Sequence, residues 1–160
     1  MEGTHHMIIN WYPGHMAKAK RLIQANLKII DVVIELVDAR IPWSSTNPMI
    51  SQLIGQKPSV VVLNKADLAD AAVLDDWIRY YKTQGRLVMA LNSKDGKGVK
   101  SLMALVRRLA APKLEHWRAR GLKNRSVRTM ILGIPNVGKS TLINKLARRS
   151  AAKTADKPGE

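Results

Sequence analysis

The 160-residue sequence contains no cysteine and few aromatic side chains. Without cysteine the chain has neither disulfides nor thiolate metal ligands, which fits a cytoplasmic location. Aromatic residues make up only 4% of the chain, so a base-stacking platform of the RNA-recognition-motif type is not expected. No apolar run approaches the roughly 20 residues of a membrane span, and the N-terminus lacks the apolar stretch of a secretory signal. We therefore expect no membrane partner.

Acidic residues are also scarce. The chain has 12 Asp and Glu against 27 Lys and Arg, which gives a formal net charge of +15. Such an excess indicates an anionic partner larger than a nucleotide, most simply RNA contacted through its phosphates. The alternatives are a generic basic surface, or an acidic region of the protein that lies outside this sequence.

The length predicts one domain with one substantial core. Residues 1–6 resemble the remains of an expression tag, with Met7 as the natural start. We therefore excluded residues 1–6 from the expected fold and assigned the domain to residues 7–160.

The strongest motif is GIPNVGKS at residues 133–140. It follows an apolar run at residues 127–132 and precedes an amphipathic segment that begins at Leu142. Strand, G-x-x-x-x-G-K-S and helix is the arrangement of a phosphate-binding P-loop, whose backbone N–H groups cradle phosphate oxygens. Lys139 would reach the β- and γ-phosphates, and the Ser140 hydroxyl would bind Mg²⁺. The alternative is a glycine turn that matches by chance.

A second motif, NKAD at residues 64–67, ends the apolar run at residues 59–63. N-K-x-D at the end of a strand is the guanine-recognition motif of GTPases. The Asp67 carboxylate can accept two hydrogen bonds from guanine, and adenine offers no such pair of donors. Lys65 would lie along the base, and Asn64 would tie the loop to the P-loop. Alone, NKAD could be an ordinary exit from a strand.

In ordinary GTPases the P-loop precedes N-K-x-D, whereas here it follows. With WYPGHMAKA at residues 11–19 and DARIP at residues 38–42, the chain resembles the circularly permuted GTPases of ribosome assembly, in particular the ribosome biogenesis GTPase A family (RbgA/YlqF). The resemblance covers residues 8–159. It implies GTP hydrolysis to GDP, binding of Mg²⁺, and a switch function on the precursor of the large (50S) ribosomal subunit and its rRNA.

The resemblance also implies roles for individual residues. His15 would act near the γ-phosphate as a catalytic residue together with Lys139, although capping or surface placement is the ordinary role of a lone histidine. Asn136 resembles the asparagine of K⁺-stimulated GTPases, with a loop residue tolerating an unusual backbone as the alternative. Asn92 and Ser93 stand where the family usually has Ser-Ala. The expected GTP-binding set is Asn64, Lys65, Ala66, Asp67, Asn92, Ser93, Asn136, Val137, Gly138, Lys139, Ser140 and Thr141.

No D-x-x-G motif follows the P-loop, and the chain stops at Glu160, before the threonine of switch I in this family. We therefore expect a partial domain, incomplete at its C-terminus, without switch II or the family's helical domain. Either the chain is a fragment, or the sequence omits further residues.

Apolar runs predict strands at residues 31–37, 59–63, 86–91 and 127–132, and amphipathic segments predict helices between them. These are a helix from His15 to Ile30, a short helix at residues 49–54, a helix capped by Asp70, and a helix from Val99 that ends at Pro112. This is an α/β fold of the P-loop GTPase class, a parallel sheet flanked by helices. The GTPase strand order would be 127–132, 31–37, 59–63, 86–91, with an uncovered edge at 127–132 that is prone to pairing.

Residues 113–128 carry seven basic side chains against one acid. They read as a connector between the two ends of an unpermuted GTPase. We expect RNA contacts from Arg118, Arg120, Lys123 and Arg125, and a solvated connector is the alternative.

Three functions remain open. The first is a GTP-hydrolysing switch in maturation of the large subunit. The second is a non-hydrolysing, basic RNA-binding fragment with an incomplete nucleotide pocket. The third is an ATP-dependent P-loop enzyme with an accidental NKAD.

Overall fold

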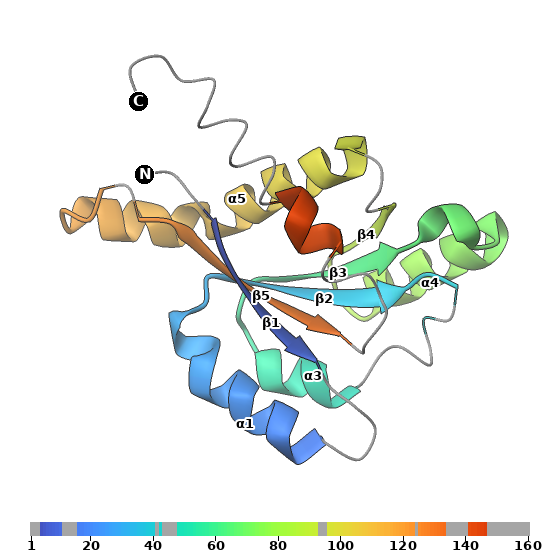
Figure 1. The fold of residues 1–160 in the computed structure, drawn as a ribbon, viewed down its shortest axis with the longest axis horizontal. Helices are drawn as coiled ribbons and strands as arrows, with labels where there is room; N and C mark the ends of the chain where they lie inside the picture. Colours follow the sequence, from blue (N-terminus) through green and yellow to red (C-terminus); the bar gives the residue numbers. More distant parts are fainter. Residues whose placement is uncertain are drawn as a thin grey trace.

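The computed structural model describes residues 4–10, 16–40, 42, 48–92, 96–123, 125–133 and 141–146. This part of the chain forms a five-stranded parallel sheet with helices on both faces (Figure 1). The strand order is β1-β5-β2-β3-β4, and the strands are β1 (Thr4–Asn10), β2 (Val32–Asp38), β3 (Ser59–Asn64), β4 (Val88–Leu91) and β5 (Val127–Gly133). The predicted α/β class and the predicted order of β5, β2, β3 and β4 are confirmed.

Strand β2 is the centre of the core, because all seven of its residues are buried. Successive side chains of a strand point to opposite faces, so an apolar run can serve two layers at once. Val32, Ile34 and Leu36 pack in one cluster with side chains of α5 (Gly96–Ala119) and with Leu142 and Leu146 of the helical segment 141–146.

The opposite face is covered by three helices: α1 (Met16–Asn26), α3 (Pro48–Ile54) and α4 (Ala71–Thr83). Val33 packs in a cluster with residues of α1 and α3, and Val37 packs in a cluster with Tyr81 of α4. Two short 3₁₀ helices, η1 (Leu27–Ile29) and η2 (Ala66–Leu68), follow α1 and β3. No described helix is long and apolar enough to cross a membrane.

The predicted start of α4 is confirmed. The Asp70 side chain accepts hydrogen bonds from the backbone N–H groups of Ala72 (3.0 Å) and Val73 (3.2 Å), as an N-cap does. Tyr81 is buried in the core, and the partly buried Trp77 packs against the same cluster.

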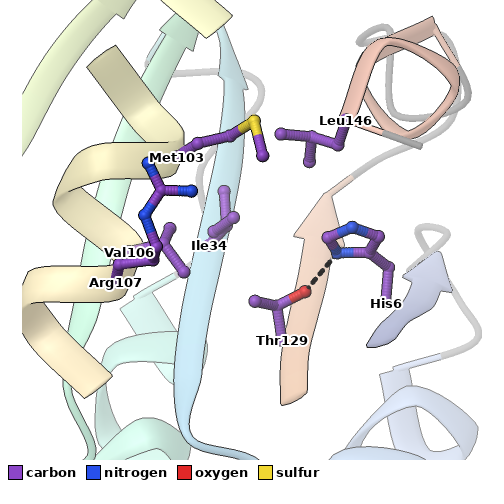
Figure 2. Close-up of a pocket in the computed structure, with 7 residues that line it drawn as sticks. All are labelled: His6, Ile34, Met103, Val106, Arg107, Thr129 and Leu146. Carbon is purple, nitrogen blue, oxygen red and sulfur yellow. Dashed lines mark hydrogen bonds between the residues drawn. The ribbon is translucent and has the colours of Figure 1, made fainter. Parts of the chain in front are cut away.

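The expectation of an uncovered edge at β5 is wrong, because β1 pairs with β5 along its whole length. This strand begins at Thr4, so residues excluded from the expected fold take part in the sheet. His6 Nδ1 lies 2.6 Å from Thr129 Oγ1 of β5 (Figure 2). The cavity beside this pair is lined by His6, Ile34, Met103, Val106, Arg107, Thr129 and Leu146 and has a volume of about 10 Å³. It holds at most one water molecule, so it is no ligand site.

The predicted end of α5 at Pro112 is also wrong, because the helix continues to Ala119. Proline removes one backbone hydrogen bond and normally ends or kinks a helix. Here the following turn is held by tertiary contacts: Lys113 forms an ion pair with Asp31, Leu114 packs against the core, and the Trp117 ring lies 5.6 Å from the Arg125 guanidinium. The first part of the expected connector is therefore helical.

A buried ion-pair cluster fixes this region to the sheet. The Asp31 side chain is fully buried and lies 3.0 Å from Lys113 Nζ and 2.9 Å from Arg125 Nη1. Its Oδ2 also accepts a hydrogen bond from the backbone N–H of Arg128 at 2.8 Å. Burial would raise the pKa of Asp31, but these hydrogen bonds outweigh it and lower the pKa. The cluster joins the start of β2, the second half of α5 and the start of β5.

We expect Asp31→Asn to lower the free energy of unfolding by about 3 kcal/mol, the low end for removing one partner of a buried ion pair, because it leaves two cations without their buried partner. The stabilisation by Asp31 is present above the ordinary aspartate pKa of 3.8 and is lost as the pH falls through the lower folded pKa. Urea unfolding of both proteins at pH 7 and at pH 3 measures this: the difference between them should shrink at pH 3.

Asp76→Asn is the matched control. Asp76 pairs with Arg79 at 3.8 Å on the exposed face of α4, where loss of the pair should cost less than about 0.5 kcal/mol. Equal effects of the two substitutions would show that the Asp31 cluster has no special role.

Candidate nucleotide site

The carboxyl ends of the strands lie at one edge of the sheet. Asp38, the last residue of β2, pairs with Asn64, the last residue of β3, and Asn64 pairs in turn with Leu91 at the end of β4. Strand β5, which precedes the P-loop, lies on the other side of β2. Ligands of open α/β sheets bind at this edge, so the parallel sheet brings the NKAD loop and the end of the P-loop strand together.

The NKAD loop has a defined shape. Asn64 is fully buried, and its backbone carbonyl accepts a hydrogen bond from the Ala39 N–H at 2.8 Å. Lys65 has a left-handed backbone with φ of 61°, which is uncommon for a residue other than glycine. Ala66 then begins the 3₁₀ turn η2, in which Asp67 is exposed. The loop thus buries its asparagine and exposes its aspartate.

A second carboxylate lies behind this loop. The Asp38 side chain is 5% exposed, and its Oδ2 lies 3.7 Å from Lys65 Nζ. Arg40 binds the same carboxylate through Nε (3.0 Å), Nη2 (2.8 Å) and its backbone N–H (2.9 Å). The hydrogen bond from the Arg40 side chain is the main cause of a lowered pKa of Asp38. The sequence expectations include residues 38–42 but give Asp38 no role; the signal in the sequence is an acidic residue at the end of an apolar run.

The third part of the site is the end of β4. Asn92 follows Leu91 directly and is half-buried. Gly98, in the first turn of α5, lies so close to β4 that a Cβ atom built on it would be 2.5 Å from Leu91 Cδ1. The first turn of α5 therefore packs closely against the end of β4.

Of the other residues expected to bind the nucleotide, only Thr141 is described. It is exposed at the start of the helical segment 141–146, whose Leu142 and Leu146 are buried. Outside the described residues lie His15, Ser93, Asn136, Val137, Gly138, Lys139 and Ser140.

The expected RNA-contact residues lie at the other end of α5. Arg118, Arg120 and Lys123 are exposed around the end of the helix. The helix ends at Ala119 and is followed by Gly121, whose φ is 89°, with hydrogen bonds from Gly121 N to Arg118 O and from Leu122 N to Trp117 O. This is a Schellman motif, which holds the basic residues on a rigid turn.

Arg125 differs from these three. Its side chain is 14% exposed and is bound to Asp31, with the Trp117 ring beside it. Its structural role, which the charge count did not reveal, is to anchor the residues before β5.

We expect Gly98→Ala to destabilise the fold by about 1–3 kcal/mol, because the new methyl group collides with a buried leucine. It should also weaken binding at the proposed nucleotide site, because the Leu91 side chain must shift and Asn92 is the next residue of the backbone. Thermal unfolding and a fluorescent-GDP titration measure the two effects. Ala104, exposed on the same helix, provides the control: Ala104→Ser should change neither. Normal stability and affinity in Gly98→Ala would contradict the close contact.

The chain was compared with known proteins. Residues 128–160 match the family model described as "50S ribosome-binding GTPase". The Ribosome biogenesis GTPase A of Bacillus cereus is 53% identical over 153 residues, which are 96% of this chain and 52% of that protein. Thus the chain spans about half the length of the curated relatives it matches.

Two solved structures are also similar, at 29% sequence identity. The GDP-bound structure of TM YlqF has a TM-score of 0.59, covering 81% of this chain and 48% of the other. The structure of GNP-bound YlqF from T. maritima has a TM-score of 0.57, covering 80% and 47%. The parallel sheet is therefore that of a P-loop GTPase, as the motifs predicted. The chain is a homologue of the circularly permuted ribosome biogenesis GTPase A (RbgA/YlqF) proteins.

Proposed function

We propose that this chain binds GTP and GDP between its NKAD loop and its P-loop, as the nucleotide-binding part of a GTPase of ribosome assembly. The observation that carries the proposal is the loop at the end of β3, where Asn64 is buried, Asp67 is exposed and β5 lies two strands away. Relatives named as GTPases, and a homologue solved with GDP, support the same reading.

In this proposal the P-loop carries the phosphate chemistry. Lys139 neutralises the β- and γ-phosphates, the Ser140 hydroxyl binds Mg²⁺, and His15 acts near the γ-phosphate. A hydroxyl oxygen is a ligand that suits Mg²⁺, which usually completes its shell with phosphate oxygens and water. The described residues contain no group of three His, Asp or Glu side chains that could hold a metal ion. When bound, Mg²⁺ would neutralise charge on the phosphates. Asn136 is the candidate ligand for K⁺.

The whole protein would be a slow, cytoplasmic GTPase that binds the maturing large (50S) subunit with GTP and leaves it after hydrolysis. The description "50S ribosome-binding GTPase" of the matching family supports this assignment. We expect residues 7–160, the GTPase domain of the proposal, to bind GDP but to hydrolyse GTP poorly, because no D-x-x-G motif follows the P-loop.

We further propose that Arg118, Arg120 and Lys123 contact rRNA phosphates. All three are exposed on the rigid turn that ends α5. The 24 residues of α5 span about 36 Å, so this turn lies far from the end of α5 that adjoins β4 and the nucleotide site (Figure 1). This separation favours one alternative for the isolated chain, an RNA-binding fragment whose affinity for RNA does not depend on nucleotide.

The first test is a fluorescent-GDP titration of this chain, competed with GTP, GDP, XDP and ATP. We expect displacement by GTP and GDP and none by ATP. Asp67→Asn should lose at least about 100-fold in GDP affinity, because two hydrogen bonds to a charged acceptor are lost, and should gain affinity for XDP. If ATP displaced the probe as effectively as GDP does, the result would instead support an ATP-dependent enzyme.

The second test is the salt dependence of rRNA binding. Replacing Arg118, Arg120 and Lys123 together by alanine should reduce the slope of log K against log salt by about three, one for each phosphate contact. Arg125→Ala is the control, because its cation is bound to Asp31: it should lower stability and leave the slope unchanged. An unchanged slope in the triple variant would rule out these contacts.

A further inference from the structure

The motif DARIP at residues 38–42 has no role in the function proposed above, yet its first residue is among the most constrained in the site. The Asp38 carboxylate is 5% exposed and receives three hydrogen bonds from Arg40. A carboxylate is costly to bury, so its charge must be compensated by groups around it. Arg40 supplies one cation, and Lys65 of the NKAD loop supplies the second at 3.7 Å.

Lys65 is held at both ends. Its backbone is fixed in the left-handed region, between the buried Asn64 and the 3₁₀ turn. Its side chain is 28% exposed, and its ammonium group lies against Asp38. A free lysine side chain has four rotatable bonds, and ordering it costs up to about 2 kcal/mol of conformational entropy. The ion pair orders this side chain before any ligand arrives.

Arg40 in turn orders Asp38. Its side chain binds both carboxylate oxygens in the forked geometry that arginine offers, while its backbone N–H binds one of them. The Arg40 side chain is 46% exposed, so its remaining surface is hydrated. The chain of contacts therefore runs from Arg40 through Asp38 to Lys65.

We propose that Asp38, oriented by Arg40, is a positioning residue for guanine nucleotide binding that holds the Lys65 side chain ready to lie along the base. The inference rests on the proposed function, since it assigns how one element of the NKAD loop is ordered. Asp38 lies behind Lys65 and acts through it. Asp67 reads the edge of the base, whereas Asp38 and Lys65 determine how well the plane of the base is supported.

This division predicts two different signatures. Asp38→Asn should lower the affinity for GDP about tenfold, at the low end for a lost interaction with a charged group. It should lower the affinity for IDP, which lacks the exocyclic amine of guanine, by the same factor. Asp67→Asn should instead change the ratio of GDP to XDP affinity. Lys65→Met keeps most of the stem but removes the ammonium group, so the loss in Asp38→Asn/Lys65→Met should be smaller than the sum of the two single losses.

Asp31→Asn is the matched control. Asp31 is a buried aspartate beside the other end of β2, it also binds two cations, and it lies far from the NKAD loop. Its GDP affinity should stay within about twofold of the parent chain, since distant sites act independently. If this variant does not fold, Glu35→Gln replaces it, which removes the buried ion pair of Glu35 with Arg86 in the same strand.

The experiment is a titration of GDP, IDP and XDP with the parent chain and each variant, together with acetylation of Lys65 in the nucleotide-free chain, measured by peptide mass spectrometry relative to the exposed Lys82. Asp38→Asn should raise the relative rate at Lys65 several-fold, because the amine is released from its partner. An unchanged rate, or unchanged GDP affinity in a variant set where Asp67→Asn loses GDP, overturns the positioning role alone. Failure of the parent chain to bind GDP, or an unaltered Asp67→Asn, overturns the proposed nucleotide site and the positioning role with it.

Discussion

The complete burial of strand β2 constrains the packing of both helical layers. Seven consecutive residues from Val32 to Asp38 are buried, and the strand pairs with β5 on one side and β3 on the other. Its alternate side chains supply the cores of both helical layers, so it cannot shift by one residue without exchanging the two faces. Because the register of β2 against both neighbours is fixed, the end of β3 has a fixed position relative to the end of β5, which precedes the P-loop. The position of the proposed nucleotide site is therefore a consequence of sheet register.

Two aspartates at the ends of β2 form ion pairs that attach neighbouring segments to the strand. Asp31, just before the strand, binds Lys113 and Arg125, while Asp38, its last residue, interacts with Arg40 and Lys65. The first cluster attaches Arg125, just before β5, to the sheet, and the second attaches Lys65 of the NKAD loop. A buried ion pair often adds little to stability compared with apolar packing, but it specifies which groups meet. In this chain the ion pairs specify that α5 contacts the start of β2 through Lys113 and Asp31, and that Lys65 contacts the end of β2 through Asp38.

Much of this fold follows from the sequence, because apolar runs and helical spacing are local signals. The runs at residues 59–63 and 127–132 became β3 and β5 almost to the residue, and the Asp70 cap needed only its own neighbours. The predictions that were wrong concern elements whose structure depends on contacts between residues far apart in the sequence. The sequence of residues 4–10 does not show that they pair with β5. A proline such as Pro112 normally ends a helix, and here the helix continues because distant residues such as Asp31 stabilise the next turn. The motifs likewise predicted that Asn64 and Asp67 share one loop after β3. The contact of Asp38 with Lys65, 27 residues away, could not be predicted in this way, because it arises from the parallel pairing of β2 and β3.

Helix α5 relates the two proposed functional ends of the chain. Its first turn contacts Leu91 through Gly98, next to the nucleotide edge, and its last turns carry Lys113, which binds Asp31, and the exposed arginines. Both ends of α5 are therefore attached to strands of the same rigid sheet. A change at the proposed nucleotide site that moved α5 against β2 would break the Asp31 cluster or open the contact of Gly98 with Leu91. Among the described residues the sheet holds α5 at both ends, so the chain by itself favours RNA contacts that are insensitive to nucleotide. Coupling between GTP and RNA would then require parts of the whole protein beyond this sheet and α5.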